Sequence, residues 1–299
     1  MADTIYTSQL QAHCDRFDTA LPAYMPATDG LQTTVAQAMA YACEGGGKRI
    51  RPVLVMEFCR LCGGEVEQAL PFAAAIEMIH SYSLVHDDLP CMDNSLLRRG
   101  RPSTHAKYGE TMALLAGDGL LNLAFETMLR PASRDGLDPS CALGAASALA
   151  DAAGIEGMVG GQVIDLESEG KTIDLSTLEA LQRGKTAALL TAACVMGARL
   201  AGASPSMEEA ARVYGEQVGL SFQIVDDILD VTATADKLGK PVGSDAENEK
   251  VTYVSLLGLE EARALAAQRT AAAVEALAVF GAEADNLRHL AQSLLERDH

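Results

Sequence analysis

Apolar residues recur along most of this chain at the three- and four-residue spacing of helices, and nowhere alternate for long enough to predict a strand. Phe72, Ile76 and Ile79, for example, mark one face of a helix that runs on into an acidic segment. Glycine and proline separate these apolar segments. The pattern predicts helices up to residue 25, over 31–43, 52–61, a stretch through 72–79, 114–129, 141–166, 178–200 and 207–231, and from 260 to the end.

The composition agrees with an all-α fold. Of the 299 residues 48% are hydrophobic and 4% aromatic, and Ala, Leu, Glu and Gln abound while runs of β-branched residues are short. There is no long Pro/Gly/Ser linker and no internal repeat. We therefore expect a single domain over residues 1–299, long enough to bury a large core.

The formal net charge of −18 argues against nucleic acid and anionic membrane surfaces as partners. The first residues, Met1 to Asp15, are polar and do not resemble a signal peptide, and no apolar run reaches the roughly 18 residues that span a bilayer. The seven cysteines are an odd number scattered over apolar segments. These features predict a cytoplasmic protein in a reducing compartment, without stable membrane insertion.

Two acidic clusters follow apolar helical runs, where carboxylates without a cationic partner are costly. In the later cluster Asp226 and Asp230 are four residues apart and share one helix face. In the earlier one Asp87 and Asp93 are six apart, so Pro90 must interrupt the helix before both can face one cavity. Magnesium binds few protein carboxylates and takes phosphate oxygens for the rest. The clusters predict two halves of a magnesium site around a diphosphate; a solvated acidic face is the alternative for either alone.

Short basic motifs could hold the phosphates. Residues 45–52, GGGKRIRP, form a glycine-rich turn whose amides can make an anion nest, and Lys48 and Arg51 can reach one phosphate together. The consecutive Arg98 and Arg99 point in different directions and can serve two diphosphates through forked hydrogen bonds. Taken singly, each group could also be a solvated loop. Residues 45–52 are not a nucleotide-binding loop, because no Ser or Thr follows the lysine, and Gly184-Lys185-Thr186 is not one because its context is helical.

Together these segments resemble the short-chain trans-prenyltransferases, the polyprenyl synthase family that includes farnesyl and geranylgeranyl diphosphate synthases. The matching stretches are GGGKRIRP, DDLPCMD followed by RRGRPSTH, GKTAAL, FQIVDDILD and LGKPVGSD…EKVTY, in the family's order over about residues 44 to 255. The resemblance implies an isoprenoid-synthase-type helical bundle around a deep central cavity, and a homodimer. It also implies Mg²⁺ as cofactor, three ions per active site, with Mn²⁺ as the alternative ion.

The resemblance further implies a role for each matching residue. The diphosphate of isopentenyl diphosphate is held by Lys48, Arg51, His80 and Arg99. The allylic diphosphate is held by Arg98, Lys185 and Lys240, with Lys250 nearby. The metal ligands are Asp87, Asp93, Asp226 and, through water, Asp230, assisted by Asp88 and Asp227. The residues nearest the reaction are Lys185, Thr186, Gln223 and Asp88, of which Thr186 and Gln223 present oxygens to the reacting carbons.

Product length should depend on the residues just before Asp87, because helical side chains lean towards the N-terminus. Tyr82 and Ser83 lie five and four positions upstream, along the growing chain. In the family an aromatic residue there accompanies a fifteen-carbon product, so the expected activity is Mg²⁺-dependent formation of farnesyl diphosphate from isopentenyl diphosphate and dimethylallyl or geranyl diphosphate. A geranylgeranyl diphosphate synthase is the alternative, and Tyr82 could also be ordinary core.

More distant alternatives fit less well. A class I terpene cyclase would share the first acidic cluster but should lack the Lys48/Arg51 pocket and carry an Asn/Ser/Glu second motif. A non-catalytic partner subunit should have lost one acidic cluster, and both are intact. Asn94-Ser95 stands where some family members have further aspartates, but the bridging aspartates remain.

Overall fold

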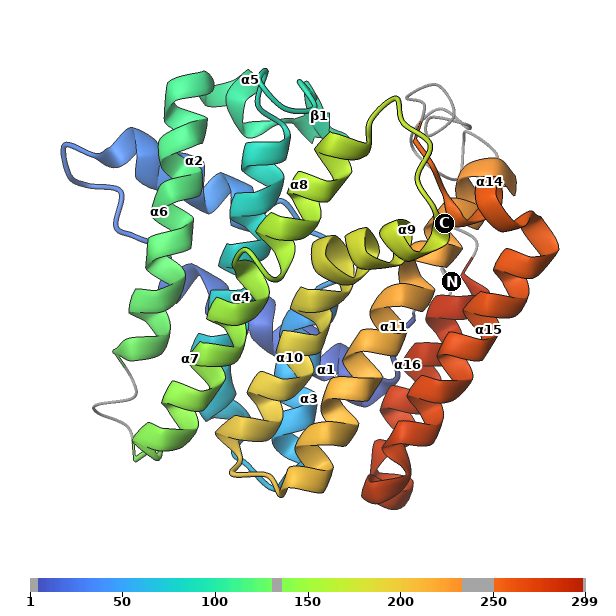
Figure 1. Ribbon diagram of the computed structural model, residues 1–299. Helices are drawn as coiled ribbons and strands as arrows, with labels where there is room; N and C mark the ends of the chain where they lie inside the picture. The colour runs from blue at the N-terminus through green and yellow to red at the C-terminus, as the bar shows by residue number, and fades with distance from the viewer. Residues whose placement is uncertain (1–4, 131–135, 233–249, 298–299) are drawn as a thin grey trace.

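The computed structural model describes residues 5–130, 136–232 and 250–297, which fold into a bundle of helices (Figure 1). The all-α prediction is confirmed. The longer helices are α1 (Ser8–Ala20), α2 (Thr33–Cys43), α3 (Ile50–Leu61), α4 (Val66–Asp87), α6 (Glu110–Leu129), α7 (Pro139–Ala153), α8 (Met158–Ser168), α9 (Leu175–Gln182), α10 (Ala188–Leu200), α11 (Pro205–Thr232), α15 (Leu259–Ala276) and α16 (Asp285–Glu296). The shorter ones are η1 (Leu21–Tyr24), α5 (Thr104–Tyr108), η3 (Arg183–Ala187), α14 (Tyr253–Leu257) and η4 (Leu277–Ala284).

Three local differences from the predicted elements matter for the site. The predicted helix over 178–200 is interrupted by η3, one turn of π-helix, and the predicted helix over 141–166 is divided between α7 and α8. A two-stranded antiparallel hairpin, β1 (Leu97–Arg98) and β2 (Arg101–Pro102), was not predicted. Its strands are two residues long, too short to give an alternating pattern.

The two helices that carry the acidic clusters lie deep in the bundle. Helix α4 packs against α3 and α6, and α11 packs against α10 and α15. Figure 1 shows both helices ending towards the top of the view, near the β1–β2 hairpin and α14. Since the clusters stand at or near the carboxyl ends of α4 and α11, the packing brings them to the same end of the bundle.

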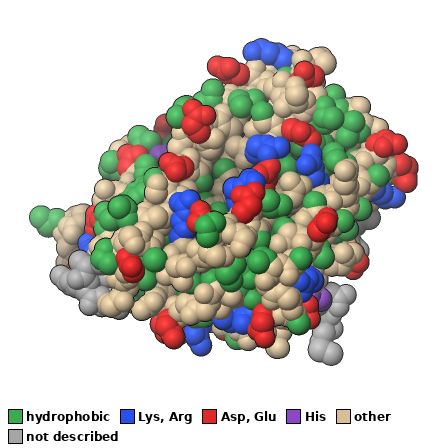
Figure 2. All heavy atoms as spheres, turned by 60° about the horizontal axis from the view of Figure 1, so that its bottom comes forward, with side chains coloured by type: hydrophobic (Ala, Val, Ile, Leu, Met, Phe, Trp, Pro, Cys, Tyr) green, Lys and Arg blue, Asp and Glu red, His purple; other side chains and the backbone are tan. Residues whose placement is uncertain are grey.

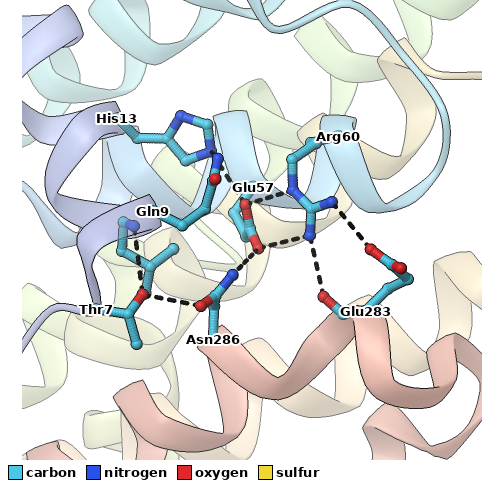
Figure 3. A network of polar contacts seen from close by, with 8 residues as sticks. Thr7, Gln9, His13, Glu57, Arg60, Glu283 and Asn286 are labelled. Carbon is cyan, nitrogen blue, oxygen red and sulfur yellow. Dashed lines mark hydrogen bonds and ion pairs between the residues drawn. The ribbon is translucent and has the colours of Figure 1, made fainter.

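A polar network around Glu57 on α3 connects the N-terminal helix α1 with the C-terminal helix α16 (Figure 3). The fully buried carboxylate of Glu57 accepts hydrogen bonds from His13 Nε2 at 3.0 Å, from Arg60 Nε at 2.9 Å and Nη2 at 3.0 Å, and from Asn286 Nδ2 at 3.5 Å. Arg60 also donates to the backbone oxygen of Glu283 at 3.0 Å. Burial raises the pKa of Glu57, but the bonds from His13 and Arg60 outweigh it and leave that pKa lowered.

We expect Glu57→Ala to lower the free energy of unfolding by about 3–5 kcal/mol, because it removes a fully buried carboxylate and leaves the donors of His13 and Arg60 without their acceptor. Equilibrium unfolding in urea measures this. The stabilisation should be present at neutral pH and fade as the pH falls through the lowered pKa of Glu57. The matched control is Glu283→Ala, whose carboxylate is 80% exposed and should cost at most about 1 kcal/mol. Equal losses in the two variants would contradict this account.

Two helical stretches, Glu110–Leu129 and Pro139–Ser168, are long and apolar enough to cross a membrane by length and composition, which corrects the prediction that no apolar run reaches that length. Part of each stretch, 39% of the apolar window, is buried inside the bundle. Core helices of a protein can be equally long and apolar, so the two stretches are weak support for a membrane span.

The lower face of the molecule carries acidic, basic and apolar side chains interspersed, without a continuous basic surface (Figure 2).

Candidate active site

The two acidic clusters meet at one cavity of about 1530 Å³. Asp87, at the end of α4, and Asp226, on α11, both line it. Basic residues from the loop before α3 and from the hairpin complete the wall. The prediction that carboxylates from distant parts of the chain converge on a shared hollow is therefore confirmed for these two residues.

The first cluster turns sharply after Asp87, as Pro90 predicted. Helix α4 ends at Asp87, and the amide of Asp93 donates back to the Asp87 carbonyl at 2.8 Å. The amide of Asn94 donates to the Leu89 carbonyl at 3.0 Å, which closes the turn. The turn brings Asp93 back beside Asp87, although its own side chain is exposed and does not line the cavity.

Burial raises the pKa of Asp87 to about 6, opposed by the positive charge of Lys185 and reinforced by Asp93 and Asp88. A cation bound beside Asp87 would offset the repulsion between its carboxylate and those of Asp88 and Asp93. Asp88 itself is buried and accepts from Arg98, with Nη2 at 2.5 Å and Nε at 3.1 Å from Oδ1. Asp88 lines a small neighbouring pocket, whereas Asp87 lines the main cavity.

The second cluster likewise presents one aspartate to the main cavity. Asp226 lines it, with 41% of its side chain exposed. Asp227 is buried, accepts from Gln223 Nε2 at 3.1 Å and from the Tyr253 amide at 2.9 Å, and lines an adjoining pocket. Asp230 is buried and lines neither of these hollows. Helix periodicity alone did not indicate that the C-terminal part of this acidic face is covered.

The glycine-rich turn shapes the basic side of the cavity. Gly47 has a φ of 125°, and a Cβ there would stand 2.5 Å from Arg99 Nη1, so this position requires glycine. Arg99 donates to the carbonyl of Gly46 and lines the cavity with Lys48 and Arg51. Burial lowers the pKa of Arg51 to about 10, which leaves it charged at neutral pH, and its buried Nε has no hydrogen-bond partner.

Arg49 fixes the loop that presents Lys48 and Arg51. It adopts the left-handed conformation, with a φ of 51°, that side chains other than glycine rarely take. Its guanidinium donates to Glu77 at 2.6 Å and to Asp18 at 2.9 Å, and these ion pairs hold the strained turn in place. Arg49 thus anchors the loop, while its neighbours on either side line the cavity.

Two further polar groups on this side have lowered pKa values. Burial, together with Arg51 and Arg99, holds the pKa of His80 well below 6.5, so its ring is neutral at neutral pH. Burial, then the charge of Arg297, lowers the pKa of Lys48. His80 and Lys48 both line the cavity beside Arg51 and Arg99, so the four residues predicted to hold isopentenyl diphosphate lie together.

The residues predicted on the allylic side are partly tied to acidic partners. Arg98 lines the cavity but is paired with Asp88. Lys185 and Thr186 stand on the π-helical turn η3, and Thr186 Oγ1 donates to Gln223 Oε1 at 3.3 Å. Lys250 lines the adjoining pocket rather than the main cavity. Lys240 lies outside the residues that the structure describes.

Sequence reasoning missed two residues that touch this site. Asp165, on α8, binds Lys185 Nζ at 2.5 Å. Arg297, after the end of α16, donates through Nη2 to Asp226 Oδ1 at 2.6 Å and stacks 3.9 Å from the ring centre of Phe222. No local pattern in the sequence marks the contact of either residue with the site.

Tyr82 and Ser83 both line the cavity upstream of Asp87. Tyr82 is only 8% exposed and packs edge-on against His86, with ring centres 5.7 Å apart. Burial raises the pKa of the Tyr82 hydroxyl. The ring therefore has a fixed position in the wall of the hollow.

The oxygen donors around this cavity suit a divalent cation that also takes ligands from phosphate. Within residues 5–130, 136–232 and 250–297, no group of three or more His, Cys, Asp or Glu side chains is close enough to hold a metal alone. Asp87 and Asp226 instead approach from different helices. This arrangement matches the habit of magnesium, which binds one or two carboxylates and completes its shell with water and phosphate oxygens.

Comparison with known proteins gives consistent matches over nearly the whole chain. The family model described as Polyprenyl synthetase matches residues 32–286. A farnesyl diphosphate synthase from Geobacillus stearothermophilus is 44% identical over 282 residues, 94% of each chain. A chloroplastic geranylgeranyl pyrophosphate synthase from Capsicum annuum is 46% identical over 267 residues, 89% of this chain and 72% of that one.

A solved structure is similar over the same extent. It is a geranyltransferase from Helicobacter pylori complexed with magnesium and isoprenyl diphosphate. The TM-score is 0.82 at 32% sequence identity, and the alignment covers 97% of both chains.

Proposed function

The chain belongs to the polyprenyl synthetase family of prenyl chain-elongating transferases, and from that premise we propose that it is a single-domain farnesyl diphosphate synthase. It joins isopentenyl diphosphate head to tail with dimethylallyl diphosphate and then with geranyl diphosphate, and releases diphosphate each time. The observation that carries this proposal is the shared cavity, which Asp87 and Asp226 line together with the basic residues Lys48 and Arg51.

The basic side of the cavity would bind isopentenyl diphosphate. Lys48, Arg51 and Arg99 supply positive charge, and the neutral His80 can donate one hydrogen bond. The unpartnered Nε of Arg51 would find an acceptor in the diphosphate. Two arginines and a lysine around one diphosphate fix its orientation, and so place the alkene for attack.

The opposite side would bind the allylic diphosphate through Arg98 and Lys185, with Lys240 and Lys250 assisting. The allylic C–O bond breaks, and its electron pair leaves with the diphosphate. The resulting carbocation lies near Thr186 and Gln223, whose oxygens face the reacting carbons. The alkene of isopentenyl diphosphate then forms the new C–C bond, and a proton leaves to the released diphosphate.

Asp87, Asp93 and Asp226 would hold Mg²⁺, three ions per site or Mn²⁺ in their place, with Asp88, Asp227 and Asp230 assisting through water. When bound, the metal neutralises charge that develops on the leaving diphosphate. The protein's own contribution is to present the Asp87 and Asp226 carboxylates to the cavity. The positive charge of Lys185 partly offsets the effect of burial, which raises the pKa of Asp87 to about 6.

Tyr82 favours a fifteen-carbon product, since its fixed ring stands in the wall upstream of Asp87. The runner-up is a geranylgeranyl diphosphate synthase, because relatives of both names have similar identity to this chain. Both activities use the same chemistry and differ in how far the chain can grow.

A homodimer in the cytoplasm is part of the same proposal. Exposed apolar side chains on α6 and α7 would be covered by a second copy: Leu114, Leu115, Leu129 and Leu143. Light scattering should then give twice the mass of one chain.

The decisive experiment incubates the protein with radiolabelled isopentenyl diphosphate, Mg²⁺ and either dimethylallyl or geranyl diphosphate, and separates the dephosphorylated products by chain length. We expect label in a fifteen-carbon alcohol from both starters, and none when the allylic substrate or the metal is omitted. A twenty-carbon main product would favour the runner-up. Failure to incorporate label with either starter would overturn the proposed activity.

A further inference from the structure

Helix α8 and the π-helical turn η3 pack backbone against backbone. A Cβ added to Gly161 would stand 2.1 Å from the amide nitrogen of Lys185, and one added to Gly184 would stand 2.9 Å from the carbonyl oxygen of Gly157. Gly161 and Asp165 are four residues apart and share one face of α8, and Gly157 immediately precedes this helix. This close contact brings Asp165 directly beside Lys185.

The Asp165 carboxylate is shared by two lysines. Its Oδ2 lies 2.5 Å from Lys185 Nζ and 3.7 Å from Lys250 Nζ. Its side chain is 15% exposed, against 29% for Lys185 and 32% for Lys250. The carboxylate is thus the least exposed of the three groups, and a charge-assisted hydrogen bond to it restricts an otherwise flexible lysine.

Lys185 also has a second acidic neighbour. Both side chains line the main cavity. The positive charge of Lys185 partly opposes burial, and the net effect is a pKa of about 6 for Asp87. Among the residues that the structure describes, however, Lys185 forms an ion pair with Asp165 and none within 4.0 Å of Asp87. The ammonium group is therefore bound to Asp165, while its charge also acts on Asp87 in the same cavity.

We propose that Asp165 is a positioning residue, which holds Lys185 against α8 and thereby keeps Asp87 open to a divalent cation. The inference rests on the proposed function, in which Asp87 binds metal and Lys185 binds the allylic diphosphate. Without the Asp165 carboxylate, Asp87 remains as an acidic side chain of the same cavity on which the charge of Lys185 acts. Lys185 would then pair with Asp87 and compete with the cation there.

The test measures binding of Mn²⁺ alone to the substrate-free protein, from the electron paramagnetic resonance signal of the unbound ion. Asp165→Asn should raise the apparent Kd for Mn²⁺ about 5- to 10-fold, the size of a weak competing ion pair. Glu167→Gln is the matched control, since it removes the same charge from an exposed position on the same helix and should leave the Kd unchanged. Thermal unfolding by circular dichroism confirms that each variant is folded.

A double variant distinguishes positioning from direct metal binding. In Asp165→Asn combined with Lys185→Gln the competing ammonium is absent, so the Kd for Mn²⁺ should return to within about twofold of wild type. An unchanged Kd in Asp165→Asn would overturn the proposal, and so would a double variant that binds as weakly as the single one. Prenyl transfer by the wild-type protein is measured separately, so its absence would count against the proposed function and not against the Mn²⁺ result.

Discussion

Replacing Asp87 by alanine is expected to lower the turnover number about a thousandfold, since it removes a carboxylate at the point where charge must be stabilised on the leaving diphosphate. Asp87 lines the cavity opposite Asp226, and no other aspartate of its cluster does so. Steady-state incorporation of labelled isopentenyl diphosphate, at saturating substrates and Mg²⁺, measures the effect. Asp151→Ala, at an exposed position on α7, is the control and should keep wild-type turnover.

The loss should not reflect unfolding, because the wild-type carboxylate is itself a source of instability. The pKa of Asp87 in the folded protein is about 6, above its ordinary value of 3.8. A group with a raised pKa contributes stability at low pH, and that contribution is lost as the pH rises through about 6. Metal-free Asp87→Asn should therefore be more stable than wild type at pH 8, by about 3 kcal/mol, and the difference should become small as the pH falls towards the ordinary pKa of 3.8. Near-wild-type turnover in Asp87→Ala would remove this residue from the proposed metal site.

Much of this site could be predicted because its chemistry is local in the sequence. The helical period placed Asp226 on a polar face, and Pro90 indicated the turn that brings Asp93 back beside Asp87. The consecutive Arg98 and Arg99 do diverge, one to Asp88 and the other to the Gly46 carbonyl. Each of these features follows from the conformation of a few neighbouring residues.

What could not be predicted depends on contacts between distant elements. Asp230 shares a helix face with Asp226 but is buried and lines neither hollow, and the helical period of α11 does not contain the packing that decides which part of that face stays open. Asp165 reaches Lys185 only because two backbones approach through glycines. Arg297 reaches Asp226 from the far end of the chain. Periodicity describes one helix at a time and contains none of this information.

The second large effect is expected at Tyr82, where alanine should change the main product from fifteen to twenty carbons or more. The ring is 8% exposed and is held edge-on by His86 in the cavity wall, so its removal should open space along the growing chain. Product chain lengths, separated by reversed-phase chromatography after dephosphorylation, measure the change. The expected shift is in product length rather than in the rate of the first condensation, because the ring lies upstream of the aspartates.

Two comparisons separate a cavity floor from an ordinary core residue. Tyr82→Phe keeps the ring and should keep the fifteen-carbon product, so the hydroxyl group is not what limits the chain. Tyr82→Ala should cost about 3–5 kcal/mol of stability whichever role the ring has, because a large buried side chain is removed. Stability therefore cannot distinguish the two roles, whereas product length can. If the folded Tyr82→Ala protein still stops at fifteen carbons, the ring is core, and chain growth must be limited by another part of the cavity wall.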